Sequence, residues 1–209
     1  TSGTATNGTD YSAINTQTIT IAAGSTTGTK SFTPADDSVY EDDEVATIAI
    51  SDVSGGGATE SGTQSVSITI TENESAPTIT LATSHTTVAE DSGATITLTA
   101  TSSQAADEAI TVTLASTGTA INGTDYSSFD GQTITIAANS TTGTITGTPT
   151  DDLIYEGDEV ATIAISNVSG IDATESGTQS VSITITENEP TPKIKLSIEA
   201  NRTAEDQAG

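Results

Sequence analysis

The sequence predicts an all-β protein built from tandem, seven-stranded antiparallel β-sandwiches of the immunoglobulin-like kind. Apolar residues alternate with Thr, Ser and Ala at a period of two, and no segment shows the 3.6-residue period of a helix. The sequence also repeats itself at an offset of 115 residues. The core must be built from Ile, Val, Leu and Ala, because the chain has no Cys, Met or Trp and only 4 Tyr and 2 Phe.

The repeat defines the expected modules. Residues 36–74 and 151–189 are identical at 33 of 39 positions without a gap. Short Pro-containing segments separate the strand-like runs and are predicted to be linkers. The chain therefore divides into the C-terminal part of a first module, a linker, one complete module, a second linker and the start of a third module, at residues 1–74, 75–77, 78–189, 190–192 and 193–209.

Seven short strands are predicted in the complete module. In chain order they contain Ile79 and Leu81; Ile96 and Leu98; Ile110, Val112 and Leu114; Ile134 and Ile136; the weakly patterned residues 143–148; Ile163 and Ile165; and Val181, Ile183 and Ile185. Gly, Asn-Gly and Ser/Thr clusters mark the turns. Seven alternating strands in roughly 110 residues are typical of a sandwich with one solvated face on each sheet.

Negative charge dominates the composition. The chain has 29 Asp and Glu residues against 4 Lys and Arg, a formal net charge of -25. Nucleic acid and anionic membrane surfaces are therefore poor partners, whereas cations are good ones. No apolar run is long enough for membrane insertion. The densest acidic stretch, residues 151–159, surrounds one tyrosine and has an almost identical copy at residues 36–44.

Strand order predicts that most carboxylates of the complete module converge at one end. If consecutive strands alternate in direction, every second connection lies at the same pole of the sandwich. That pole collects 11 of the 15 carboxylates: Glu90, Asp91, Asp125, Asp130, Asp151, Asp152, Glu156, Asp158, Glu159, Glu187 and Glu189. The opposite pole collects Asp107, Glu108, Asp172 and Glu175.

This convergence favours calcium. Calcium takes six to eight oxygen ligands, magnesium keeps more of its own water, and softer metals prefer Cys and His, of which the chain has 0 and 1. The alternative interpretation is a solvated acidic surface that maintains solubility. Two tyrosines beside these turns, Tyr126 and Tyr155, are expected to be packing residues whose hydroxyls bond to backbone.

The acidic motifs resemble those of a known family. They lie at residues 88–93 after the first strand, 123–126 after the third, 151–159 before the sixth and 184–189 at the end of the seventh. Together they resemble the Calx-beta domain, the calcium-binding sandwich of sodium–calcium exchangers that is also repeated in large bacterial surface and adhesin-like proteins. The resemblance covers essentially the whole chain. It implies that calcium binds at the acidic pole.

The resemblance also implies a set of ligands. In the complete module the family's positions fall on Glu90, Asp125, Asp151, Asp152 and Glu156, and on the terminal triplet Glu187, Asn188 and Glu189. In the first module the matching residues are Asp10, Asp36, Asp37, Glu41, Glu72 and Glu74. The counterpart of Glu90 would precede Thr1 there, and the third module contains only Glu205. Because Asn188 is neutral, fewer or weaker sites than in the exchangers are expected.

We therefore expect a calcium-binding structural repeat of a long extracellular or cell-surface protein. Its partners would be calcium ions and neighbouring repeats, with calcium locking the acidic loops and the linker angle. One alternative is a recognition module for a sugar or protein, with Phe129 and Ile171 as candidate contacts. Another is a filament subunit assembled by strand exchange, since residues 1–74 lack two strands of their module. An enzyme is not expected, because the chain has one His and therefore none placed to activate a serine in each repeat, and aromatics are too few to line a sugar cleft.

Overall fold

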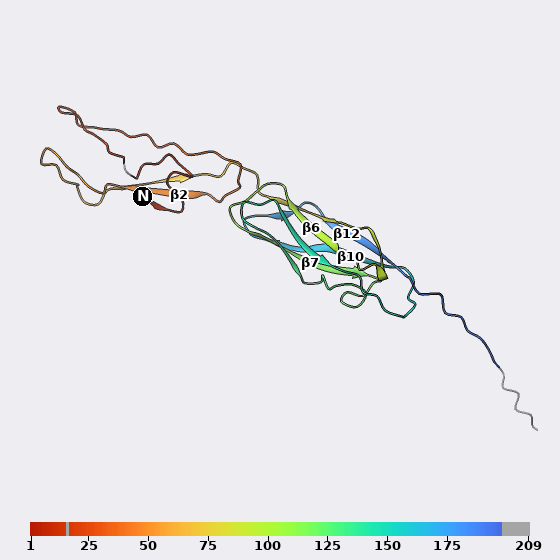
Figure 1. Cartoon of the computed structure of the whole chain (residues 1–209). Helices are drawn as coiled ribbons and strands as arrows, with labels where there is room; N and C mark the ends of the chain where they lie inside the picture. Colours follow the sequence, from red (N-terminus) through yellow and green to blue (C-terminus); the bar gives the residue numbers. More distant parts are fainter. Residues whose placement is uncertain (16, 198–209) are drawn as a thin grey trace, which may run out of the picture.

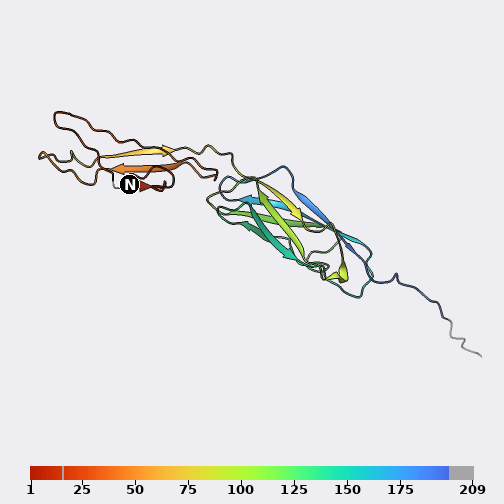
Figure 2. The ribbon, with the colours of Figure 1, turned by 45° about the horizontal axis from the view of Figure 1, so that its top comes forward.

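A computed structural model describes residues 1–15 and 17–197 of the protein. Two β-structured parts follow one another end to end in an elongated molecule (Figures 1 and 2). The first part contains the sheet β1-β2-β3, formed by β1 (Ser2–Gly3), β2 (Glu44–Ala49) and β3 (Ser65–Ile70). Nowhere in the described ranges is there a helix that could cross a membrane.

The second part is a sandwich of two sheets. A five-stranded sheet has the order β5-β12-β10-β7-β8, and a four-stranded sheet has the order β11-β4-β6-β9. The strands are β4 (Thr78–Thr83), β5 (Thr87–Ala89), β6 (Ile96–Ser102), β7 (Ile110–Gly118), β8 (Thr133–Ile136), β9 (Thr142–Gly147), β10 (Glu159–Ser169), β11 (Thr174–Glu175) and β12 (Ser180–Thr186). A short 3-10 turn, η1 (Glu90–Ser92), follows β5.

The seven predicted strands are confirmed as β4, β6, β7, β8, β9, β10 and β12. Their alternation follows the sequence pattern, as β7 shows: Ile110, Val112 and Leu114 are buried between the sheets, while the threonines between them are half-buried. Each fully buried Ile, Leu or Val side chain contributes about 1.5–3 kcal/mol relative to an exposed one. The alternation therefore accounts for the core without any large aromatic cluster.

Two short pairings depart from the predicted antiparallel arrangement. After β4 pairs with β6 in one sheet, the chain continues in the same direction and β5 joins the edge of the other sheet, parallel to β12. Likewise, β11 pairs in parallel with β4. These strands are only 3 and 2 residues long, too short to show an alternating pattern. As a result, β5 and β12 finish side by side at the acidic pole.

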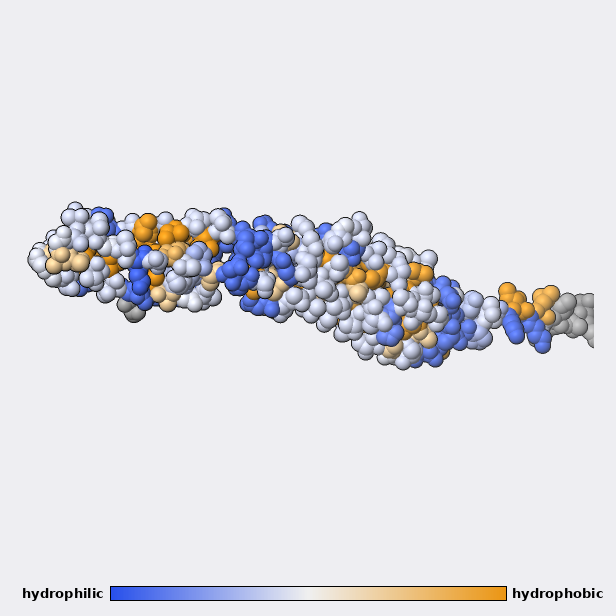
Figure 3. All heavy atoms as spheres, turned by 90° about the horizontal axis from the view of Figure 1, so that it is seen from above, coloured by the Kyte–Doolittle hydropathy of each residue, from blue (hydrophilic) through white to orange (hydrophobic). Residues whose placement is uncertain are grey.

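The first part repeats one half of this architecture. Strands β2 and β3 pair in the same register as β10 and β12, with Glu44 opposite Ile70 and Glu159 opposite Ile185. The described residues within 1–74 form no counterpart of the second sheet, so apolar residues stay in solvent. Ile19 and Ile21 are 60% and 58% exposed. Their counterparts in the second part, Ile134 and Ile136, are buried. Figure 3 shows exposed apolar residues on this part in orange.

The two parts touch through the acidic stretch of the first. Tyr40 lies in a β-bridge to Ala106 of the second part. Its backbone N–H donates to the Ala105 carbonyl (2.9 Å), and its own carbonyl accepts from the Asp107 N–H (3.1 Å). The acidic pole of the first part thus faces the opposite pole of the second. Strongly hydrophilic residues form one band at this junction and another where the chain leaves the second part (Figure 3).

Candidate metal centre

Three groups of carboxylates are close enough to share a cation. Within each group, one oxygen per residue lies within 4.8 Å of the others. We call Glu90, Glu187 and Glu189 the strand-end cluster, and Asp125, Glu156 and Glu159 the loop cluster; both lie at the acidic pole of the second part. The third group, Asp10, Glu41 and Glu44, is the junction cluster of the first part.

The strand-end cluster arises from the parallel pairing of β5 with β12. Ala89, the last residue of β5, is opposite Thr186, the last residue of β12, so Glu90 and Glu187 emerge next to each other. Glu90 is buried and its Oε1 accepts the Asp152 N–H at 3.2 Å. Burial raises its pKa above the usual value. A buried carboxylate of this kind needs a proton or a cation.

Glu187 is held in the charged form by the backbone. Its carboxylate accepts N–H groups of Glu189 (2.8 Å), Glu156 (2.5 Å), Gly157 (2.9 Å) and Asn188 (2.9 Å). These hydrogen bonds lower the pKa of Glu187 to about 2. The hydrogen bond with this charged neighbour, followed by desolvation, raises the pKa of Glu189 to about 7. The Oε2 of Glu189 is buried without a hydrogen-bond partner among the described residues.

The loop cluster joins the turn after β7 to the start of β10. Asp125 is buried, and its Oδ2 accepts the Ile121 N–H at 2.6 Å. Glu159 opens β10, and burial together with a hydrogen bond to Asp125 raises its pKa to about 7. Glu156 is exposed; desolvation and the charge of Asp125 raise its pKa as well. Glu159 therefore retains a proton near neutral pH, which a divalent cation can replace.

Gly118 brings the two segments of the loop cluster together. Its φ is +129°, and a Cβ there would lie 2.0 Å from the Val160 carbonyl oxygen. This close approach lets the N–H groups of Thr119 (2.9 Å) and Ala120 (3.2 Å) donate to that same oxygen. The Thr119 hydroxyl accepts the Val160 N–H at 2.8 Å. The loop that carries Asp125 is thereby fastened to the strand that begins with Glu159.

Five of the eight ligand positions expected in residues 78–189 fall in the two clusters: Glu90, Asp125, Glu156, Glu187 and Glu189. Asp151, Asp152 and Asn188 lie beside them. The Asn188 amide donates to Asp151 at 3.4 Å, and Asp152 accepts the Ile154 N–H at 2.6 Å. Glu159 belongs to the loop cluster but was not among the expected ligands. The sequence feature that could have identified Glu159 as a ligand is its place at the end of the acidic stretch, residues 151–159.

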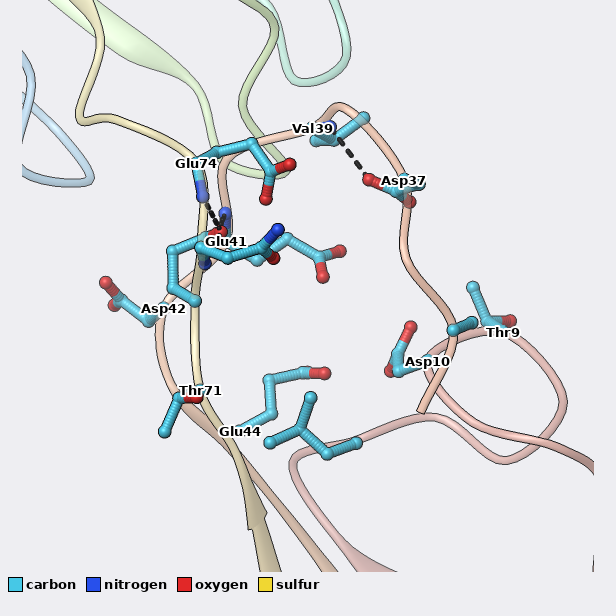
Figure 4. Close-up of a pocket in the computed structure, with 13 residues that line it drawn as sticks. Thr9, Asp10, Asp37, Val39, Glu41, Asp42, Glu44, Thr71 and Glu74 are labelled. Carbon is cyan, nitrogen blue, oxygen red and sulfur yellow. Dashed lines mark hydrogen bonds between the residues drawn. The ribbon is translucent and has the colours of Figure 1, made fainter. Parts of the chain in front are cut away.

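The junction cluster is the copy of the loop cluster in the first part. Figure 4 shows Asp10, Glu41 and Glu44 around one pocket, with Asp37 and Glu74 at its margin. The expected residues Asp36, Glu72 and Glu74 lie outside the cluster itself, although Glu72 accepts the Glu41 N–H and Asp36 accepts from Asn73 at 3.1 Å. Burial, then a hydrogen bond to Asp10, raises the pKa of Glu44 to about 7.

The aromatic and apolar candidates differ in how far they are buried. Phe129 and Ile171, the contacts considered for a recognition module, are both buried. Tyr126 packs in the core as predicted, but its hydroxyl has no partner among the described residues instead of bonding to backbone. Tyr155 does not pack: it is 41% exposed. Its copy Tyr40 is buried, and the Tyr40 hydroxyl donates to the Asp172 carboxylate at 3.2 Å.

Comparison with known proteins gives two family matches. The model of the Calx-beta domain matches residues 72–189, and the model of the LapA domain matches residues 11–74. No curated protein matches the chain. A similar solved structure is the apo form of the Calx CBD1 domain, at 20% identity and a TM-score of 0.44, covering 54% of this chain and 99% of that one.

Two further similar solved structures are longer than the segment that this chain matches. CBD12 from CALX1.2 is 19% identical with a TM-score of 0.43, covering 50% of this chain and 42% of that one. The calcium binding domain CBD12 of CALX1.1 is 20% identical with a TM-score of 0.42, covering 51% of this chain and 45% of that one.

Proposed function

The chain belongs to the Calx-beta domain family, and from this premise we propose that it binds calcium at its carboxylate clusters and acts as a non-catalytic, calcium-stiffened spacer. The observation that carries the proposal is the pair of three-carboxylate groups at one pole of residues 78–189, in a chain of net charge -25. A match to the LapA domain supports placing the spacer in an extracellular, surface-attached, adhesin-like protein.

The carboxylates suit a hard cation. The strand-end cluster offers Glu90, Glu187 and Glu189, and the loop cluster offers Asp125, Glu156 and Glu159. Asp151 accepts from the Asn188 amide and the Asp152 N–H donates to Glu90, so both residues adjoin the strand-end cluster. Bound calcium would supply positive charge that replaces protons on Glu189 and Glu159, whose pKa values are about 7.

Stiffening follows from where the ligands come from. The two clusters join the ends of β5 and β12, the turn after β7 and the acidic stretch before β10. A cation that holds these segments together opposes their independent movement. The junction cluster would do the same at the boundary with the first part, if residues 1–74 and 193–209 belong to further Calx-beta modules in tandem. Millimolar extracellular calcium saturates even weak sites of this type.

A calcium titration by calorimetry on the whole chain tests the proposal. We expect Glu187→Gln to weaken binding at least about tenfold, since it removes the most firmly charged ligand of the strand-end cluster. Asp91→Asn is the matched control, because this neighbour of Glu90 is exposed and outside the clusters. Melting temperature and small-angle scattering are measured with calcium and with chelator. Identical melting and identical length in both conditions would contradict the spacer function.

A further inference from the structure

Tyr40 occupies a socket on the second part of the chain. Although it sits in an acidic stretch, it is only 8% exposed and belongs to the same cluster of buried residues as Ala106 and Ile171. Two backbone hydrogen bonds join it to the loop at residues 105–107, and its hydroxyl donates to Asp172 at 3.2 Å. The ring, the backbone and the hydroxyl are therefore all engaged across the junction.

The socket is built with an unfavourable backbone. Ile171 and Asp172 have φ values of +33° and +53°, in the left-handed region that a β-branched residue rarely adopts. This turn directs the Asp172 carboxylate toward the tyrosine hydroxyl. At the corresponding positions the first part has Gly56 and Gly57, which offer no side chain for such a contact. The socket thus requires the side chains of Ile171 and Asp172 in addition to the fold.

The second part carries the same tyrosine without a socket around it. Tyr155 is the copy of Tyr40 and is 41% exposed, and the preceding residues Leu153 and Ile154 are 91% and 62% exposed. In the first part, Val39 is half-buried at the position of Ile154. An apolar tip on an otherwise acidic loop is unfavourable in water unless another surface covers it. The chain leaves the second part at this same pole (Figure 1).

We propose that Leu153, Ile154 and Tyr155 form a docking surface for the module that follows Pro192 in the same polypeptide, with Tyr155 entering a socket like that of Ala105–Asp107 and Asp172. The occupant is argued from continuity of the repeat: Pro192 matches Pro77, and residues 204–206 match residues 89–91. The inference rests on the proposed spacer of successive modules. It adds the contact that would set their spacing: the tyrosine of one module packs into the socket of the module that follows.

Amide hydrogen exchange tests the existing socket first. In the 209-residue chain, Tyr40→Ala should raise exchange of the Asp107 amide, which donates to the Tyr40 carbonyl, at least tenfold. Tyr40→Phe should raise it less, because only the hydrogen bond to Asp172 is lost. Tyr155→Ala should leave the Asp107 amide unchanged. Equal exchange in all variants would overturn the role assigned to the tyrosine.

The proposed surface is then tested in the full chain lengthened by a second copy of residues 78–192 placed after Pro192. Here Tyr155→Ala should raise exchange of the added copy's counterpart of Asp107 at least tenfold and broaden the length distribution from scattering. The exchange of Val112 and of its counterpart reports that both sandwiches stay folded. No change at the counterpart of Asp107 would overturn the inference.

The two proposals fail separately. A chain that shows no calcium binding but responds to Tyr155→Ala would contradict the calcium site alone. A chain that binds calcium but is indifferent to Tyr155→Ala would contradict the docking surface alone. All exchange measurements are therefore made both in calcium and in chelator.

Discussion

Gly118 illustrates how one residue positions the acidic loop that carries Asp125. Its backbone passes so close to Val160 that any side chain would collide with the carbonyl oxygen, and Gly3 stands in the same relation to Val45 in the first part. Such a glycine is required by contact as well as by its positive φ. Sequence repetition shows that both glycines are kept at an offset of 115, but the contact itself is visible only in three dimensions.

We expect Gly118→Ala to lower the free energy of unfolding by about 2 kcal/mol or more, because strain and collision add. It should also weaken calcium binding at the loop cluster. Gly131→Ala is the control: this glycine has φ +69° but nothing within 4 Å, so only the conformational cost of about 1 kcal/mol applies. Chemical denaturation measures both, and equal losses would show that the contact with Val160 is unimportant.

At the level of single side chains, sequence reasoning located most of the carboxylates that meet. Glu90, Asp125, Glu156, Glu187 and Glu189 do fall in clusters. The sequence could not show that Glu159 completes the loop cluster, since that depends on the contact of Gly118 with the start of β10. Nor could the sequence show that Tyr40 is buried and Tyr155 exposed. The two residues stand in the same motif, and their burial depends on the surface that lies next to each.

Strands were predictable where two or more apolar residues alternate. β7 and β12 each bury residues at every second position, and the sequence alone identifies them. β5 and β11 were not predicted, because strands of 3 and 2 residues are too short to show alternation of apolar and polar residues. Their parallel pairing arises where the chain crosses from one sheet to the other. This crossing is part of the tertiary structure and leaves no local sequence pattern. The missed strand β5 is the element that delivers Glu90 to the strand-end cluster.

Val88 anchors β5 and gives the next prediction. Its side chain is 5% exposed and is the one buried apolar group of this strand. Val88→Ala should cost about 1–3 kcal/mol of stability and reduce calcium binding, since β5 and the adjoining Glu90 lose their anchor. Val160→Ala, at a position 37% exposed, is the matched control and should cost under about 1 kcal/mol. A loss of stability without any loss of calcium affinity would separate β5 from the site.

Across the whole molecule, acidic residues gather at the ends of the two parts. The acidic pole of the first part meets Asp107 and Asp172 of the second, so like charges face one another at the junction. Burial first, and then neighbouring negative charges including Asp107, raise the pKa of Glu41. Like-charge repulsion therefore acts where the parts meet, and a cation bound there would reduce it.

This charge predicts that, in chelator, the stability of the folded protein falls as the pH rises through neutrality. Glu44, Glu159 and Glu189 have folded-state pKa values of about 7, above their ordinary 4.5. Their stabilising contribution is complete below pH 4.5 and is lost as the pH rises through about 7. Glu187, with a pKa of about 2, contributes above pH 4.5 and loses that contribution as the pH falls through about 2.

The melting temperature in chelator should therefore fall between pH 5 and pH 8, by roughly 5 °C or more. Saturating calcium should reduce or reverse the fall, because calcium binds the deprotonated carboxylates and binds them better at higher pH. Scanning calorimetry at several pH values measures both curves. A melting temperature that rises with pH in chelator would contradict the raised pKa values of Glu44, Glu159 and Glu189.

The parallel pairing of β5 with β12 also determines how the second part responds to tension. Pulling on the two ends draws β5 toward the junction and β12 toward the acidic pole, so the two parallel strands are loaded in shear. The contacts of Thr87, Val88 and Ala89 with residues 184–186 must then break together and cannot unzip one by one. Because Glu90 and Glu187 follow directly on these strands, a cation bound between them would oppose the same sliding of β5 along β12.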